Sequence, residues 1–259
     1  MFETIFSIII PFIGTILGAG TVFFVKKRLS ENVNRAFSGF ASGVMIAAAI
    51  WSLILPSFDA SVKMGKLDFI PLVVGLWLGF LFLMVLDKVV PHIHIDTDEK
   101  EGPKCNLKKS TMTALAVALH NLPEGLAVGI VLASAKNEAS VVPLSMAIAL
   151  AIGIAVQNFP EGAIISLPLN DCGIKKSKTF ALGVLSGVVE PVGALVTLLL
   201  ANIITPILPY MLSFAAGAMI YVVVEELIPE MSKGKHSHMG TIFFAIGFTL
   251  MMILDILLG

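Results

Sequence analysis

The sequence predicts an all-α integral membrane protein with eight transmembrane helices and both termini on the extracytoplasmic side. The 259 residues are 57% hydrophobic and 14% charged, with a mean hydropathy of +0.95, which lies outside the range of soluble domains. Apolar stretches of about 20 residues, enough to cross the hydrocarbon core, recur along the chain. Lys and Arg gather in alternate gaps between these stretches. We expect one domain, 1–259, embedded in the bilayer.

Four predicted spans are almost free of charged side chains. Two of them carry none and two carry one acid each near an end, over 4–25, 36–58, 69–87 and 239–258. Four further segments are as apolar but contain isolated glutamates, over 110–135, 140–169, 179–204 and 208–230. The boundary between the sixth and seventh predicted spans rests on Pro206 and Pro209, because proline disfavours a continuous helix.

The distribution of basic residues predicts the orientation. All but three of the 17 Lys and Arg residues lie in the loops after spans one, three, five and seven, including the loop 88–109. Loops retained in the cytoplasm are enriched in Lys and Arg. These loops are therefore predicted to be cytoplasmic, in a multi-pass membrane protein. Cys105 and Cys172 fall in two of them, where thiols stay reduced, so we expect no disulfide.

Glutamates interrupt the second group of spans without any Lys or Arg beside them. They are Glu124, Glu161, Glu190, Glu225 and Glu226. Each ionisable residue in a span costs roughly 2.5 to 3.5 kcal/mol on insertion scales, which suggests a role for each. Buried carboxylates without basic partners either take up protons or hold a mobile cation. The pattern therefore indicates a positively charged substrate.

Two of the acids lie in closely similar phrases, which form an internal repeat. Residues 120–125 read His-Asn-Leu-Pro-Glu-Gly and residues 157–162 read Gln-Asn-Phe-Pro-Glu-Gly. One outside loop separates the two helices, so they run antiparallel, as expected for inverted repeats that meet near the bilayer midplane. Their polar side chains can then face each other.

The spacing within each phrase predicts a metal site. Residues three and four apart share one face of a helix, so the converging side chains are His120, Asn121 and Glu124 on one helix and Gln157, Asn158 and Glu161 on the other. Imidazole, carboxylate and amide groups together suit borderline divalent ions such as Zn²⁺, Cd²⁺, Fe²⁺ and Mn²⁺. Glu124 and Glu161 can bridge two ions, with Glu190 completing the second position. The metal is expected as cargo, with no prosthetic group.

At these residues the sequence resembles the ZIP (Zrt/Irt-like protein) family of divalent metal transporters, in its bacterial GufA-like branch. The resemblance implies a first metal position formed by Met45, His120, Glu124, Gln157 and Glu161. It implies a second formed by Asn121, Glu124, Asn158, Glu161 and Glu190. It further implies an elevator-like motion, in which spans one, four, five and six slide against two, three, seven and eight within a homodimer.

Several polar residues keep more than one interpretation. Glu190 fits a metal ligand, a proton relay or a packing acid, whereas Glu225 and Glu226 fit a gate, a relay or a helix cap. Met45 on its own reads as a packing residue. The loop pairs His92 with His94 and His236 with His238 fit either weak metal sites or solvated loop residues.

The preferred function is transport of a divalent cation into the cytoplasm by alternating access. Zinc is the first candidate for the ion, with cadmium, iron and manganese as further candidates. The chain is not expected to be an enzyme. The alternative is an intramembrane metal-dependent hydrolase. Against it, no His-Glu-x-x-His helix occurs and His120 is the one histidine within the spans, too few for a usual catalytic zinc site. Expected partners are divalent metal ions, the lipid bilayer and a second copy of the chain. With a net charge of -1, nothing points to nucleic acid.

Overall fold

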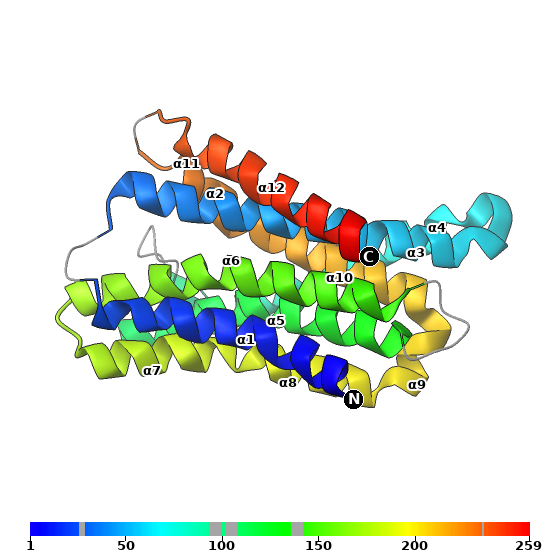
Figure 1. Cartoon of the computed structure of the whole chain (residues 1–259), viewed down its shortest axis with the longest axis horizontal. Coiled ribbons are helices and arrows are strands. Elements are labelled where there is room, and N and C mark those ends of the chain that lie inside the picture. Colours follow the sequence, from blue (N-terminus) through cyan, green and yellow to red (C-terminus); the bar gives the residue numbers. More distant parts are fainter. Residues whose placement is uncertain (26–28, 94–99, 102–107, 136–141, 235) are drawn as a thin grey trace.

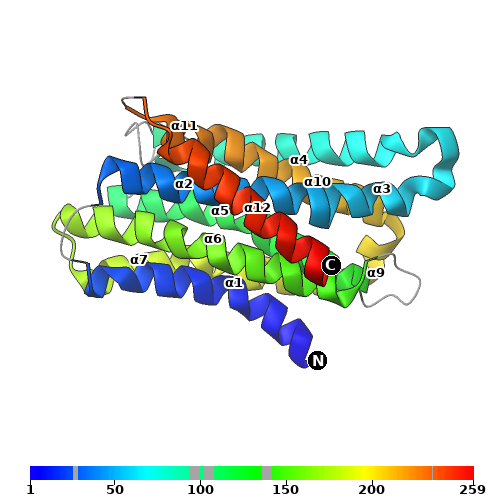
Figure 2. The same cartoon turned by 45° about the horizontal axis from the view of Figure 1, so that its top comes forward.

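The structure, a computed structural model, describes residues 1–25, 29–93, 100–101, 108–135, 142–234 and 236–259 (Figure 1). Within these residues, 8 helices are long and apolar enough to cross a membrane. This confirms the predicted number of spans. The spans lie roughly along one axis and form an elongated bundle (Figures 1 and 2).

The spans are built from the following helices. The first four are α1 (Phe2–Gly20) with η1 (Thr21–Phe23); α2 (Glu31–Ala48), η2 (Ala49–Ile54) and α3 (Leu55–Ser61); η3 (Val62–Leu67) with α4 (Phe69–Val89); and α5 (Lys109–Ala135). The last four are α6 (Leu144–Asp171); α7 (Lys176–Gly187) with α8 (Val189–Leu199); α9 (Ala201–Ile204), η4 (Thr205–Ile207), α10 (Leu208–Val222), η5 (Val223–Leu227) and α11 (Ile228–Ser232); and α12 (Met239–Leu258). Two segments, η2 and η5, are π-helical.

The second and seventh spans begin earlier than their sequences suggested. The second span starts at Glu31, where the Ser30 side chain accepts a hydrogen bond from the Val33 amide and caps the helix. The sixth span ends at Leu199, so the break precedes Pro206. Pro206 and Pro209 instead occupy the first turns of η4 and α10, where a missing amide hydrogen removes no helical bond.

The loop between spans three and four contains a short pair of strands. β1 (His92–Ile93) and β2 (Lys100–Glu101) pair antiparallel, with His92 opposite Glu101. Apart from this pair, the secondary structure of the described residues is helical, which confirms the all-α prediction for the spans. His94 and Cys105, both named above as residues of this loop, lie outside the described ranges.

The helices divide into two layers (Figure 1). The first, called here the site layer, contains α1, α5, α6, α7 and α8, in which α1 packs on α6 and α5 packs on α8. The second, called here the companion layer, contains α2, α3, α4, α10, α11 and α12, in which α2 packs on α12 and α4 packs on α10. The main hydrophobic core draws on both layers, with Met45 and Met219 from the companion layer and Ile154 from the site layer.

Both termini lie at one end of the bundle (Figures 1 and 2). The connections after spans one, three, five and seven lie at the opposite end, which is the end that carries most of the basic residues. This end is called here the basic end. The arrangement agrees with the even number of spans, while the side of the membrane on which each end lies stays a prediction, as does the inverted repeat.

Close backbone packing joins helices within each layer. A Cβ added at Gly18 of α1 would strike the carbonyl oxygen of Phe159 on α6, and one at Gly43 of α2 would strike that of Phe244 on α12. Across the layers, a Cβ at Gly153 of α6 would instead meet the side chain of Met251 on α12. Glycine permits such close helix approach in membranes. Each layer is therefore interlocked through main chain, whereas this contact between layers is made by a flexible side chain.

The packing of α1 on α6 gives a stability prediction. Gly18→Ala should destabilise the protein by about 1–3 kcal/mol, the usual cost of overpacking, because the new methyl group meets main chain. Gly20→Ala is the matched control, since a Cβ there meets only the Phe180 ring, at 3.9 Å. Thermal unfolding in detergent should show a lower Tm for the first variant alone. Equal Tm values for the two variants would contradict the close packing.

Candidate metal site

Helices α5 and α6 bring polar side chains of the two repeated motifs together with Glu190 of α8 inside the site layer. Five of them are at most 1% exposed, namely Asn121, Glu124, Gln157, Asn158 and Glu190. The helices α5 and α6 continue through Pro123 and Pro160, so the residues one turn apart keep a common face. The sequence pattern thus produces a buried polar cluster from three different spans.

The amide groups of this cluster donate hydrogen bonds to acids and to main chain. Gln157 Nε2 donates to Glu124 Oε1 at 2.5 Å, which links α6 to α5. Asn121 Nδ2 donates to Glu190 Oε1 at 3.1 Å and to the carbonyl oxygen of Ser186 at 3.3 Å. Asn158 Nδ2 donates to the carbonyl oxygen of Pro11 at 3.4 Å. Each amide therefore turns its nitrogen to a protein acceptor.

The oxygens of the same cluster are left unpaired. Buried side-chain oxygens without a hydrogen-bond partner within the described residues include Asn121 Oδ1, Glu124 Oε2, Gln157 Oε1, Asn158 Oδ1 and Glu190 Oε2. An unsatisfied buried polar group costs about 1–3 kcal/mol, so a concentration of acceptors at one place requires an explanation. A bound cation supplies one, because carboxylate and amide oxygens are metal ligands.

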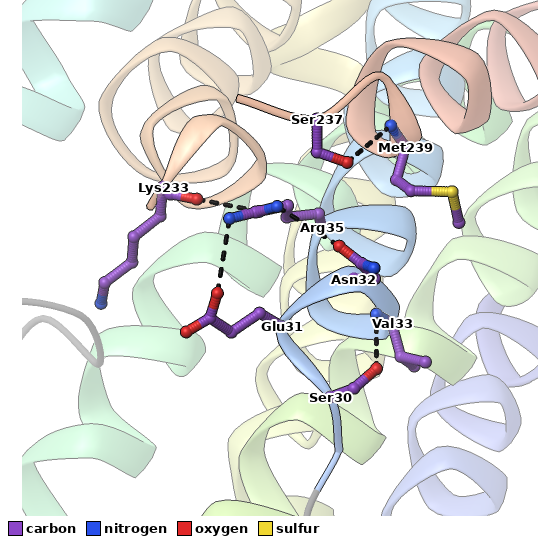
Figure 3. A network of polar contacts seen from close by, with 8 residues as sticks. All are labelled: Ser30, Glu31, Asn32, Val33, Arg35, Lys233, Ser237 and Met239. Carbon is purple, nitrogen blue, oxygen red and sulfur yellow. Dashed lines mark hydrogen bonds and ion pairs between the residues drawn. The ribbon is translucent and has the colours of Figure 1, made fainter. Parts of the chain in front are cut away.

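A buried basic side chain is present, but it is engaged elsewhere. Arg35, near the start of α2, is 6% exposed. Its Nε donates to the carbonyl oxygen of Lys233 at 2.8 Å, and its Nη2 lies 3.5 Å from Glu31 Oε2 (Figure 3). Nη1 donates to Asn32 Oδ1 at 3.3 Å. This guanidinium joins the start of α2 to the loop before α12 and does not neutralise the buried acids of the site layer.

A second part of the candidate site borders a cavity between the layers. His120 and Glu161 line this cavity, of about 40 Å³, together with Glu226 and Glu230 from the companion layer. His120 Nε2 lies 3.4 Å from Glu226 Oε1. The neighbouring Glu225 is exposed. Glu226 is thus the acid that faces the site, a distinction that the sequence left open.

The predicted first position is divided in this structure. Glu124 is paired with Gln157, whereas His120 faces Glu226 across the cavity. In the described part of the chain, no three His, Cys, Asp or Glu side chains are grouped so that they could hold a metal ion. Met45 is 1% exposed and belongs to the main hydrophobic core. The ligand set implied by resemblance therefore stays a prediction.

His236 and His238 of the loop before α12 lie apart from this cluster. Both are exposed, and their ring centroids are 4.8 Å apart in an edge-to-face arrangement.

Sequence reasoning missed Thr15 of α1, whose Oγ1 donates to Glu190 Oε1 at 2.8 Å. A hydroxyl group within an apolar span carries no charge or motif signal, so nothing in the sequence marked it.

Comparison with known proteins identifies the family. The family model described as "ZIP Zinc transporter" matches residues 96–255. The chain is 36% identical over 251 residues to "Zinc transporter ZIPB" of Bordetella bronchiseptica. This alignment covers 96% of this chain and 79% of that protein. It is 33% identical over 250 residues to "Zinc transporter GufA" of Myxococcus xanthus, which covers 95% of this chain and 96% of that one.

The similarity extends to an animal protein. The chain is 30% identical over 322 residues to "Zinc transporter ZIP11" of Bos taurus, which covers 95% of this chain and 94% of the relative. These relatives are named as transporters, so the comparisons support transport rather than the hydrolase alternative. Together with the eight spans and the buried acceptor cluster, they show that this multi-pass membrane protein belongs to the ZIP zinc transporter family.

Proposed function

We propose that this chain carries zinc ions, and in addition cadmium, iron(II) or manganese, into the cytoplasm. The observation that carries the proposal is the set of unpaired buried oxygens on α5, α6 and α8, which a desolvated divalent cation would satisfy. The names of the relatives support zinc as the substrate. The donor set of carboxylates, amides and one imidazole suits zinc and its borderline neighbours.

The ion is held at two adjacent positions. The first uses Met45, His120, Glu124, Gln157 and Glu161, and the second uses Asn121, Glu124, Asn158, Glu161 and Glu190. Two hydrogen bonds support the grouping: Gln157 with Glu124, and Asn121 with Glu190. Glu124 and Glu161 are shared by both positions, which makes the site binuclear.

Transport proceeds by an elevator-like sliding of the site layer along the companion layer. Main-chain packing within each layer, at Gly18 and Gly43, supports two rigid bodies, whereas the side chain of Met251 meets Gly153 between them. The cavity beside His120 is lined by Glu230 of α11, and α11 lies at the basic end of the bundle (Figure 1). The charge distribution predicts that this end faces the cytoplasm.

The setting of the transporter follows from the same predictions. The gathering of Lys and Arg in the loops after spans one, three, five and seven supports termini on the extracytoplasmic side. A bacterial cytoplasmic membrane and a homodimer remain predictions that the family resemblance implies.

Flux through the purified protein tests the proposal. In proteoliposomes, the wild-type chain should move zinc faster than empty vesicles, and Glu124→Ala and Glu161→Ala should abolish that flux because both acids belong to both metal positions. Glu3→Gln is the control, since Glu3 is an exposed acid in the first turn of α1. Folded wild-type protein that moves none of zinc, cadmium, iron(II) or manganese would refute the proposal.

Adjacent acids allow a second, matched test. Glu226→Gln should lower the maximal zinc flux severalfold, because it removes a charge that faces His120 across the cavity at 3.4 Å. Glu225→Gln changes the exposed neighbour and should leave flux near that of the wild type. Initial rates over a range of zinc concentrations separate the maximal rate from the apparent KM. Equal effects of the two variants would show that the cavity contact has no part in transport.

A further inference from the structure

Helix α1 contributes no candidate ligand, yet it contacts two residues of the second metal position. Thr15 Oγ1 donates to Glu190 Oε1 at 2.8 Å. One turn earlier, the Pro11 carbonyl oxygen accepts from Asn158 Nδ2 at 3.4 Å. Residues four apart share a helix face, so both contacts come from one side of α1. This side faces the buried acceptor cluster.

The hydroxyl group of Thr15 departs from the usual behaviour of hydroxyls in these spans. A helical Ser or Thr commonly donates to a carbonyl one turn earlier, as Ser42 does to Ser38 and Ser166 does to Gly162. Thr15 instead donates to a carboxylate on another span, as Ser52 does to Asp255. The hydroxyl therefore serves the site and not its own helix.

Two glycines fix the place of the Thr15 side chain. A Cβ at Gly187 of α7 would lie 2.8 Å from Thr15 Cγ2, and one at Gly162 of α6 would lie 2.5 Å from the Thr15 carbonyl oxygen. Because both glycines lack that atom, α1 approaches closely and the Thr15 methyl group packs on Gly187. Thr15 is 1% exposed, and a β-branched side chain is stiff about χ1. Its hydroxyl is thus held toward Glu190.

The two oxygens of the Glu190 carboxylate have different roles. Oε1 accepts from Thr15 and from Asn121, whereas Oε2 has no partner in the described part of the chain. Hydrogen bonds to a charged group are stronger than those between neutral groups. They fix the orientation of the carboxylate and leave one defined oxygen for a ligand, as supporting groups around metal ligands do.

We propose that Thr15 is a positioning residue for the second metal position, which it builds through Glu190 without contacting the ion. The proposal rests on the proposed function, because it requires Glu190 to be a metal ligand. Thr15 holds Oε1, and Oε2 is thereby presented to the cation. Span one is in this way part of the binding unit and not only its outer support.

A double-mutant cycle tests the proposal. Zinc binding to the detergent-purified protein is titrated for the wild type, Thr15→Val, Glu190→Gln and the double variant. Thr15→Val should weaken the binding of the zinc ion at the second position by about tenfold. This loss corresponds to the net contribution of a hydrogen bond to a charged group. In the Glu190→Gln background the same change should have almost no further effect, because the residue through which Thr15 acts is already altered.

Companion variants separate positioning from packing. Thr15→Ser keeps the hydroxyl and should restore most of the affinity, while Thr15→Ala removes it without adding bulk if the valine variant does not fold. Thr21→Val is the matched control, since the Thr21 hydroxyl donates only to the Gly18 carbonyl oxygen at 2.7 Å. It should leave both affinities unchanged.

The outcomes distinguish this proposal from the proposed function. Tenfold losses that add up in the double variant, or wild-type affinity in both Thr15→Val and Thr15→Ala, would overturn the role of Thr15. Unchanged binding in Glu190→Gln would overturn it as well, together with the second metal position. Zinc flux by the wild type in proteoliposomes is judged separately, so transport can stand while Thr15 fails.

Discussion

Unpaired acceptor oxygens within a lipid-embedded helix layer are the constraint on which the rest of the structure depends. Carboxylate oxygens of Glu124 and Glu190 and amide oxygens of the neighbouring Asn and Gln residues are buried without donors in the described part of the chain. The amide nitrogens are already bonded, and the Arg35 guanidinium is held at the start of α2. A bound cation would offset the free-energy cost of these unsatisfied buried acceptors, which no donor within the described residues relieves.

The division into two layers is the arrangement that the proposed elevator-like motion requires. Apart from Met45, the predicted ligands belong to α5, α6 and α8, and α1 contacts two of them, Glu190 and Asn158. Main-chain packing at glycines interlocks these helices, so the acceptor cluster would keep its geometry in such a motion. The companion layer supplies the opposite wall, with Glu226 facing His120. Binding and access are therefore assigned to different parts of the fold.

The span count and the acceptor cluster could be predicted from sequence because each has a strong physical signal. Hydropathy over about 20 residues marks a span, and the repeated phrases around Glu124 and Glu161 mark paired helix faces. The structure brings Asn121 to Glu190 and Gln157 to Glu124 as these faces suggest. His120 could not be placed in advance, because its contact comes from η5 in another layer.

Other features carry no local signal. Glu226 and not Glu225 of η5 lines the cavity, and the adjacent acids look alike in sequence. Thr15 is a hydroxyl in an apolar span, and the glycines that admit it lie on two other helices. The central claim is tested most directly by anomalous diffraction at the zinc edge from crystals grown with zinc. The account predicts an anomalous peak within bonding distance of Glu124 and of the free oxygens of Gln157, Asn158 and Glu190. Zinc-bound protein with no peak there, and with those oxygens paired to protein or water donors, would contradict it.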